Sequence, residues 1–318
     1  MTLRPAYRYA KLVGRHGPLY PFRQSVFPRR ILAARPIHTE TSGDIKVCVL
    51  TSRKDWLLCL WSLVSFYEFS GRRDPLLIFS DGTLSPCQQS AILRVFPDAR
   101  IIHRSWADEA MSGVLDPYPR CMLYRAAQPF AARIVDFPAL CHSPFILVLD
   151  SDVLFFREPA EMNAHLAARR PGSFVFLRDY QDAYFAPRYR IREEFGLDLP
   201  PAVNCGLMFA DVSGFHYDWF EDWLTRPEVF SHGWSEQTLW AMYSARKDST
   251  DTRILGGDYV VRPGRGIPSR MVLRHYVTPV RDLMYIEGIP YLDGLLRERG
   301  VFGAADVRLA PSALSPTP

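Results

Sequence analysis

The stretch from Phe145 to Pro159, FILVLDSDVLFFREP, decides the fold. An aliphatic run over residues 145–149 ends in Asp150-Ser151-Asp152, after which a second apolar run begins. The first run is short and lacks helical periodicity. We therefore expect a buried central strand of a mostly parallel sheet.

Two carboxylates one residue apart at the end of such a strand point to a ligand site. Unpaired buried charges are costly, and ligands of open α/β sheets bind outside the carboxyl ends of the strands. Asp150 and Asp152 offer hard oxygen ligands, which suit Mn²⁺ or Mg²⁺ carrying a phosphate. A surface turn with two solvated Asp side chains is the alternative.

Strand and helix patterns alternate ahead of this stretch. We expect strands over residues 44–51, 76–79 and 99–103, with helices over 54–69 and about 85–95 between them. Such alternation predicts a parallel sheet with right-handed crossovers. The expected fold class is therefore α/β, with a mostly parallel central sheet flanked by helices.

The composition fits a globular protein of 318 residues, of which 48% are hydrophobic. We expect a single domain over residues 44–300, a basic arm packed loosely on it over 1–43, and a weakly ordered tail over 301–318. The six cysteines contain no Cys-x-x-Cys, which indicates reduced core residues in a cytoplasmic protein.

Charge is unevenly distributed along the chain. Residues 1–36 hold eight Lys or Arg and no acid, so the formal net charge of +4 leaves −4 for the remainder. A solvated tail explains such a run most simply. Peripheral contact with an anionic inner membrane face is the alternative. No nucleic-acid motif accompanies the charge, so we expect no nucleic-acid partner. No apolar run is long enough to be a transmembrane segment.

The motif and the residues after it resemble the Asp-x-Asp run of GT-A-type glycosyltransferases. These enzymes move a sugar from a nucleoside diphosphate to an acceptor. Haloacid-dehalogenase-like phosphatases are the rival, and there Asp150 would be a nucleophile. A phosphatase also needs a later Lys and an acidic pair, whereas Gly257-Asp258 has no second acid close behind it. A non-catalytic nucleotide- or carbohydrate-binding protein with this fold is a further alternative.

Further stretches resemble the family 8-type group of these enzymes. A Tyr-x-Arg helix precedes the motif, which implies that Arg125, or else Arg120, reaches the donor. Asn204 and Gly206 match an Asn-x-Gly strand at the donor sugar. The ends of the first two expected strands are placed to bind the base and ribose. Together these stretches give the expected donor-binding residues: Thr51, Arg53, Asp81, Arg125, Ser151, Asn204, Gly206 and Arg281.

Glu236-Gln237 resembles an Asp-Gln pair that the family holds near the reacting centre. Ser235 as a helix N-cap, with an acid in the first turn, explains the same residues structurally. The resemblance implies a reaction that retains configuration. An inverting reaction would need a carboxylate base, for which Glu236 or Asp182 could serve. Glu236, Gln237 and Asp182 are therefore the candidate catalytic residues.

The family pattern His-x-x-Gly-x-x-Lys-Pro-Trp is matched in part by His275 and Arg281, which keep its spacing. The resemblance implies that His275 binds metal with Asp150 and Asp152, and that Arg281 holds the diphosphate. The Gly, Lys and Pro-Trp of the pattern are replaced, which changes the expected local loop.

The sequence thus predicts a metal-dependent glycosyltransferase that uses Mn²⁺ or Mg²⁺. A nucleotide-sugar donor, with a UDP-sugar favoured, would supply a hexosyl-like group. A glycan, lipid or other hydroxyl compound would accept it. The polar and aromatic residues 178–192 are expected to form a loop that contributes to the acceptor site.

Overall fold

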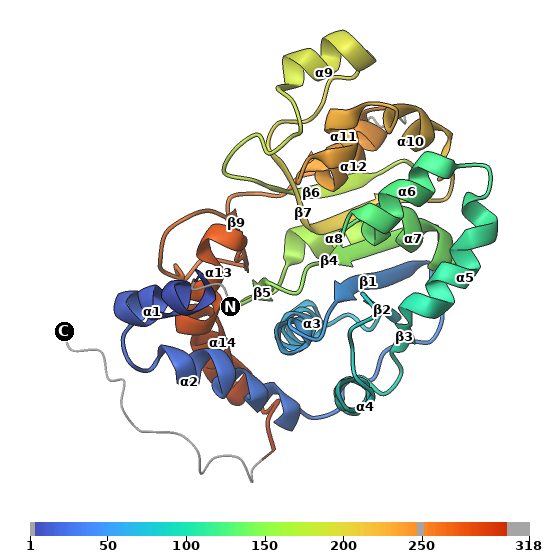
Figure 1. Cartoon of the computed structure of the whole chain (residues 1–318). Coiled ribbons are helices and arrows are strands. Elements are labelled where there is room, and N and C mark those ends of the chain that lie inside the picture. Colours follow the sequence, from blue (N-terminus) through green and yellow to red (C-terminus); the bar gives the residue numbers. More distant parts are fainter. Residues whose placement is uncertain (1–3, 247–250, 304–318) are drawn as a thin grey trace.

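Strand β4 (Phe145–Leu149) lies at the centre of the main sheet, as its uninterrupted apolar sequence predicts. The computed structural model describes residues 4–246 and 251–303. Within these residues seven strands form the sheet (Figure 1). Their order is β3 (Arg100–Ile102), β2 (Leu76–Ser80), β1 (Ile45–Thr51), β4, β7 (Val203–Asp211), β6 (Phe174–Arg178) and β8 (Thr252–Ile254). Every residue of β4 is buried because helices cover both faces of the sheet.

The first half of the sheet is parallel, as predicted. Strand β1 (Ile45–Thr51) pairs in parallel with β2 (Leu76–Ser80) and with β4, and β2 pairs in parallel with β3 (Arg100–Ile102). Helices α3 (Trp56–Ser70) and α4 (Pro86–Val95) make the crossovers. The carboxyl ends of β1, β2 and β4 therefore meet at one edge of the sheet, where such sheets bind ligands.

The second half of the sheet is mixed. Strand β7 (Val203–Asp211) runs antiparallel to β4 and to β6 (Phe174–Arg178), and β8 (Thr252–Ile254) runs parallel to β6. Four of the six pairings among the described strands of this sheet are parallel. The predicted fold class, a mostly parallel α/β sheet flanked by helices, is confirmed.

A second, small sheet joins two distant parts of the sequence. Strand β10 (Leu273–His275) is antiparallel to β5 (Val153–Phe155) and parallel to β9 (Tyr259–Val261). In this register His275 pairs with Val153, the residue after the second Asp of the motif. The small sheet therefore brings the expected metal-ligating histidine to the end of the central strand.

The remaining described helices surround these sheets. We expected residues 178–192 to form a loop. They do so only in part, because a helix, Arg188–Phe195, begins within them. The helices are α5 (Arg104–Leu115), α6 (Pro119–Ala127), α7 (Ala132–Leu140), α8 (Ala160–Ala168), α9 (Arg188–Phe195), α10 (Asp218–Trp223), α11 (Pro227–Ser231), α12 (Ser235–Arg246), η2 (Thr278–Val280), α13 (Arg281–Leu283), η3 (Met284–Gly288) and α14 (Ile289–Glu298).

Two hydrophobic cores fill the two faces of the main sheet. Alternate residues of β4 enter them, with Leu147 in the core shared with α3 and α14, and Val148 in the core shared with α7 and α12. This alternation follows from the pleat of a strand. The cores hold the ends of the strands in fixed positions beside one another.

The N-terminal segment differs from the expected loosely packed arm. It forms α1 (Arg4–His16), α2 (Tyr20–Ser25) and the short helix η1 (Phe27–Ala33). Ile31 is fully buried in the core beneath α3, and the indole of Trp61 donates a hydrogen bond of 2.8 Å to the carbonyl of Pro28. The apolar residues between the basic ones anchor the segment, which the charge pattern alone did not reveal.

The C-terminal boundary is also shifted slightly. Val301 is fully buried, and Phe302 forms a β-bridge with Ala34, so the chain remains packed up to this point. The remainder of the expected tail, residues 304–318, lies outside the described residues. Among the described helices, none has the length and apolar character needed to cross a bilayer.

Replacing Ile31 by Ala tests whether the N-terminal segment belongs to the core. A fully buried Ile truncated to Ala loses about 2–4 kcal/mol of unfolding free energy through lost burial and the cavity left behind. Urea denaturation of Ile31→Ala should show this loss, whereas Leu19→Ala, at an exposed side chain of the same segment, should change stability by less than about 0.5 kcal/mol. Equal, small effects would show that the segment is only loosely attached.

Candidate functional site

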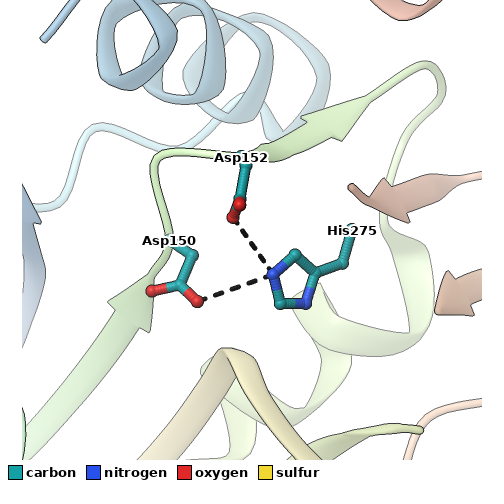
Figure 2. Close-up of side chains that lie close together, drawn as sticks. All are labelled: Asp150, Asp152 and His275. Atoms are coloured by element: carbon teal, nitrogen blue, oxygen red, sulfur yellow. Dashed lines mark hydrogen bonds and ion pairs between the residues drawn. The ribbon is translucent and has the colours of Figure 1, made fainter. Parts of the chain in front are cut away.

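Three side chains that could hold a metal ion meet at the carboxyl end of β4. One ligand atom from each of Asp150, Asp152 and His275 lies within 4.8 Å of the others (Figure 2). His275 Nε2 is 3.1 Å from Asp152 Oδ1 and 3.6 Å from Asp150 Oδ2. Two carboxylates and an imidazole form a donor set that suits Mn²⁺ or Mg²⁺.

Backbone hydrogen bonds from neighbouring strands hold the two aspartates in place. The amide of Asp150 donates to the carbonyl of Gly206 on β7 at 2.8 Å. The carbonyl of Asp152 accepts from the amide of Tyr276, which follows β10, also at 2.8 Å. Each carboxylate therefore stands on backbone fixed by a different sheet.

Asn204 on β7 orients the imidazole. His275 Nδ1–H donates to Asn204 Oδ1 at 2.8 Å, and Asn204 Nδ2 donates to Asp179 at 2.7 Å. Because Nδ1 carries the proton, Nε2 faces the carboxylates with its lone pair when the ring is neutral. The strand thus selects the tautomer that can bind a metal.

Gly206 permits the close approach of this ring. A Cβ atom built at Gly206 would lie 2.3 Å from His275 Nδ1 and 2.4 Å from Cε1, which is far inside contact distance. A side chain at this position would displace the imidazole from its place against β7. Gly206 therefore acts by making room for His275 and does not line the cavity described below.

Opposite charges dominate the electrostatics of the cluster. Burial lowers the pKa of His275, but the Asp152 and Asp150 carboxylates outweigh it and raise this pKa above its usual range. Burial raises the pKa of Asp152, but His275 and Arg281 outweigh it and leave this pKa below its ordinary value. The two carboxylates thus favour a proton on His275, and a bound cation would compete with that proton for the same place.

A cavity of about 580 Å³ opens over the cluster. Its size falls in the range of small-molecule sites, which is roughly 300–1,000 Å³. Most of the sequence-predicted site residues line it: Thr51, Asp81, Asp150, Ser151, Asp152, Asn204, Glu236, Gln237, His275 and Arg281. Chain segments far apart in the sequence thus converge at the carboxyl edge of the sheet.

The structure corrects the choice of Arg125 as the donor-contacting arginine. Its guanidinium binds both carboxylate oxygens of Asp136 at 2.7 Å and also contacts Asp108, so α6 directs it toward α5 and α7. Its fallback, Arg120, contacts Glu221 on α10. Neither arginine lines the cavity.

A different arginine, Arg133, lines the cavity beside Asp150. Its Nη1 lies 3.2 Å from Asp150 Oδ1 and 3.4 Å from Glu236 Oε2, and Nη2 donates to the carbonyl of Cys205. The side chain is buried and lines the cavity. The sequence offered a signal, because an arginine inside the apolar run AARIVDF requires a buried partner.

Two other predicted residues also lie outside the cavity lining. Asp182 accepts from the amide of Ala202 at 2.7 Å and from Arg188 at 3.2 Å, so it stabilises its own loop. Arg53 is engaged through its backbone, where its amide donates to Thr83 Oγ1 at 2.8 Å. In the sequence both residues follow a strand, but in the structure neither lines the cavity.

Glu236 is the buried carboxylate facing the cluster. It belongs to the first turn of α12, while Ser235, which we considered as an N-cap, is the first helical residue and bonds to the Tyr124 hydroxyl at 2.8 Å. Burial raises the pKa of Glu236 to about 7, and Arg133 opposes this shift. This carboxyl can therefore hold or release a proton near neutral pH.

Gln237 makes two hydrogen bonds to the backbone. Its Nε2 donates to the carbonyl of Ala183 at 2.9 Å, and its Oε1 accepts from the amide of Cys205 at 3.4 Å. Both groups tie α12 to β7 and to the 178–187 loop. Gln237 still lines the cavity, at the point where these three elements meet.

Arg281 supplies a positive charge on the opposite wall. Its Nη2 lies 3.0 Å from Asp55 Oδ1, and its Nε lies 3.4 Å from Asp152 Oδ2. The side chain is about one-third exposed and lines the cavity. A planar guanidinium beside a cation site is suited to bind phosphate oxygens.

Comparison with known proteins gives no match to a family model and none to a curated protein. Among solved structures the chain is similar to galactosyltransferase LgtC in complex with donor and acceptor sugar analogs. The two sequences are 13% identical, the match covers 81% of this chain and 100% of that chain, and the TM-score is 0.39. It is also similar to the apo form of mouse xyloside xylosyltransferase 1, with 12% identity, coverage of 77% and 99%, and a TM-score of 0.50.

The chain has a GT-A fold. The similarity to the xylosyltransferase extends over nearly the whole of that protein, so the GT-A architecture is matched as a unit and not as an isolated motif. The predicted GT-A-type sheet is thereby confirmed. At this level of identity the likeness concerns the fold, and the chemistry of the site must be argued from its own residues.

The substitution Gly206→Ala tests the positioning of His275. The added Cβ would force the imidazole off β7, so we expect Mn²⁺ affinity to fall roughly tenfold or more, as when the support of a metal-bound histidine is lost. Isothermal titration calorimetry with Mn²⁺ measures this. Gly214→Ala is the matched control, because a Cβ there meets nothing within 4 Å. Equal affinities would remove His275 from the ligand set.

The raised pKa of Glu236 predicts a pH-dependent stability. The folded protein holds this proton up to about pH 7, whereas the unfolded chain loses it near 4.5. The stabilisation that this group contributes is therefore fully present below pH 4.5 and is lost as the pH rises to 7. The free energy of unfolding falls over this range by an amount of order 3 kcal/mol. Urea denaturation should show that Glu236→Gln lacks this part of the pH dependence. A constant difference between the two proteins from pH 4.5 to 7.5 contradicts the assignment.

Proposed function

We propose that the protein is a metal-dependent glycosyltransferase that transfers a sugar from a nucleoside diphosphate to a hydroxyl acceptor. The observation that carries this proposal is the Asp150-Asp152-His275 cluster inside a large cavity of a GT-A fold. Arg281 on the facing wall adds the second positive group that a departing diphosphate requires.

The residues fit a divalent cation. Asp150, Asp152 and the Nε2 atom of His275 would hold it, and the hydrogen bond from His275 Nδ1 to Asn204 turns Nε2 toward the two carboxylates. When bound, Mn²⁺ or Mg²⁺ would neutralise negative charge on the diphosphate. Deprotonated carboxylates are required for this. Burial raises the pKa of Asp150, and the positive charges of Arg133 and His275 oppose this shift.

The strand ends that line the cavity suggest where the nucleoside of the donor binds. Thr51, Asp81 and Ser151 surround the carboxyl ends of β1, β2 and β4, where a nucleoside would be bound. Asp81 already accepts two hydrogen bonds from Thr83, so a donor would meet a preformed turn there. A uridine base is favoured by the family resemblance of the Asp-x-Asp stretch.

Arg133 and Glu236 are placed to contact the donor sugar. Both face the cavity beside Asp150, and Glu236 Oε1 has no hydrogen-bond partner among the described residues. A sugar hydroxyl could supply the missing donor. Asn204, which we expected at the sugar, has its amide engaged with His275 and Asp179, so we assign it to positioning His275.

The catalytic roles follow from these positions. Of the two carboxylates considered as bases, Asp182 lies outside the cavity and Glu236 lies within it. Glu236 would therefore accept the proton of the acceptor hydroxyl if the reaction inverts configuration. With retention, which the family resemblance favours, Glu236 and Gln237 would instead stabilise positive charge that develops on the sugar.

The cavity mouth suggests where the acceptor binds. Phe130, Tyr180 and Trp234 line the cavity and are 55%, 44% and 42% exposed. They come from three separate loops, and loops beside a rigid sheet commonly bind substrate. Exposed aromatic rings around a polar cavity suit a glycan, a lipid-linked sugar or another hydroxyl compound.

The alternative function, that of a phosphatase, has less support. A phosphatase would use Asp150 as a nucleophile with a lysine nearby, and none of the described residues lining the cavity is a lysine. Asp150 instead forms ion pairs with Arg133 and His275. A protein that binds the donor without turning it over shares the site, and the assay below distinguishes it.

A thermal-shift panel tests the proposal, with UDP, GDP, CDP and ADP each measured with and without Mn²⁺. A ligand that binds only the folded state adds about 2.7 kcal/mol of apparent stability at a hundredfold excess over Kd. We expect a Mn²⁺-dependent shift with one nucleoside diphosphate. Asp152→Asn should lose it, whereas Asp116→Asn, at an exposed carboxylate, should keep it. A shift of equal size in Asp152→Asn, or none with any nucleotide, overturns the proposal.

Hydrolysis of the matching nucleotide sugar then separates an enzyme from a binding protein. Release of nucleoside diphosphate in the presence of Mn²⁺ identifies a transferase. Binding without release, with or without added sugar acceptors, favours the non-catalytic alternative.

A further inference from the structure

The outward face of the N-terminal segment combines basic and apolar side chains. On α1, Tyr7, Lys11 and Arg15 follow one another at a spacing of four, so they share one face of the helix, and all three are exposed. The opposite face packs inward, where Tyr9 and His16 contact the ring of the buried Tyr20.

Helix α2 continues this surface with apolar residues. Leu19, Phe22 and Val26 are spaced by three and four and are 61%, 46% and 52% exposed. They lie on the side of the chain away from Tyr20, which is buried. Large apolar side chains grouped in this way beside cations are unusual on a surface that only faces water.

The loop at residues 262–270 adds further positive charge. Arg262, Arg265 and Arg270 are exposed there, and Arg265 Nη2 donates to His16 Nδ1 at 2.9 Å, which joins the loop to α1. The buried guanidinium of Arg274 holds the loop by donating to the carbonyls of Gly264 and Gly266. The arginines are thus carried on fixed backbone.

Acids near this surface are mostly engaged in ion pairs or hydrogen bonds. Asp282 contacts His16 and Arg15, Glu287 contacts Arg274, Asp293 contacts Arg30 and Arg297, and Asp258 lies 3.5 Å from Arg270. The first 36 residues contain no acid. The exposed face therefore carries positive potential next to its apolar residues.

We infer that this face docks on an anionic lipid surface. We name it the basic face and define it by the exposed side chains of Tyr7, Lys11, Arg15, Leu19, Phe22, Val26, Arg262, Arg265 and Arg270. Cations would meet the phosphate headgroups, and Leu19, Phe22 and Val26 would enter the boundary of the acyl chains. The contact does not depend on the proposed transfer reaction.

Charge and chemistry favour lipid over other occupants. A second copy of the chain, docked face to face, would bring like charges together. A nucleic acid would match the cations but would leave the aliphatic side chains of Leu19 and Val26 without a role. A lipid surface provides anionic groups and an apolar layer at adjacent depths.

The basic face is also linked to the wall of the cavity. His16 Nε2–H donates to Asp282, the neighbour of Arg281, and Arg23 donates to the carbonyl of Ile286 at 3.3 Å. Figure 1 shows α1 and α2 beside α13 and α14 at one edge of the molecule. Docking would therefore hold the Arg281 wall of the cavity close to the lipid surface.

Vesicle flotation with the full chain tests the inference. The vesicles are phosphatidylcholine alone, or phosphatidylcholine with about one third phosphatidylglycerol. We expect binding only to the anionic vesicles, weakened by salt. Lys11→Glu/Arg15→Glu/Arg265→Glu should lower the partition coefficient by at least about tenfold. The control Arg94→Glu/Arg190→Glu/Arg192→Glu makes the same charge change at exposed arginines of α4 and α9 and should stay within about twofold.

A second variant separates insertion from adsorption. Leu19→Ser/Phe22→Ser/Val26→Ser keeps every charge and should still lose at least about fivefold in partition. Circular dichroism and thermal melts confirm that each variant is folded. No preference for anionic vesicles, equal loss in the control variant, or full binding by the serine variant would overturn the inference. So would binding to heparin or DNA without binding to vesicles.

Discussion

The pairing of β10 with β5 is the constraint on which the site depends. It places His275 beside Asp152, although 123 residues separate them in the sequence. β4 ends just before the first aspartate, and β5 begins just after the second. A short antiparallel pairing against β5 therefore converts a local carboxylate motif into a three-residue donor set.

Charge balance explains why so many ionisable groups can be buried together. Asp150, Asp152 and Glu236 face Arg133 and Arg281, with His275 between the two aspartates. An unpaired charge in this position would be strongly destabilising, whereas a network of opposite charges with good hydrogen bonds is tolerated. A divalent cation would enter as one more member of this network and would displace the proton on the imidazole.

The sequence predicted the strands and the three residues of the Asp150-Asp152-His275 cluster because both depend on strong local patterns. Aliphatic runs that end in polar residues define β1, β2 and β4. Asp150 and Asp152 follow β4, and His275 is the last residue of the short strand β10. Helix faces were harder to predict, since Arg125 and Arg133 belong to adjacent helices and only tertiary packing decides which faces the cavity.

The N-terminal segment was also mispredicted, for a related reason. Its charge suggested a loosely packed arm, but a few apolar residues such as Ile31 suffice to anchor a segment when they reach a core. Burial of this kind depends on a partner surface formed by α3, which the local sequence does not contain.

The contact between Gly206 and His275 makes position 206 a marker for sorting relatives of this chain. The imidazole fills the space that any side chain at 206 would need. A relative that has lost the glycine must also have moved or replaced the histidine, so the two changes are expected together. Chains that carry a larger residue at this position are therefore the first to examine for pseudoenzymes that keep the fold and have given up the metal.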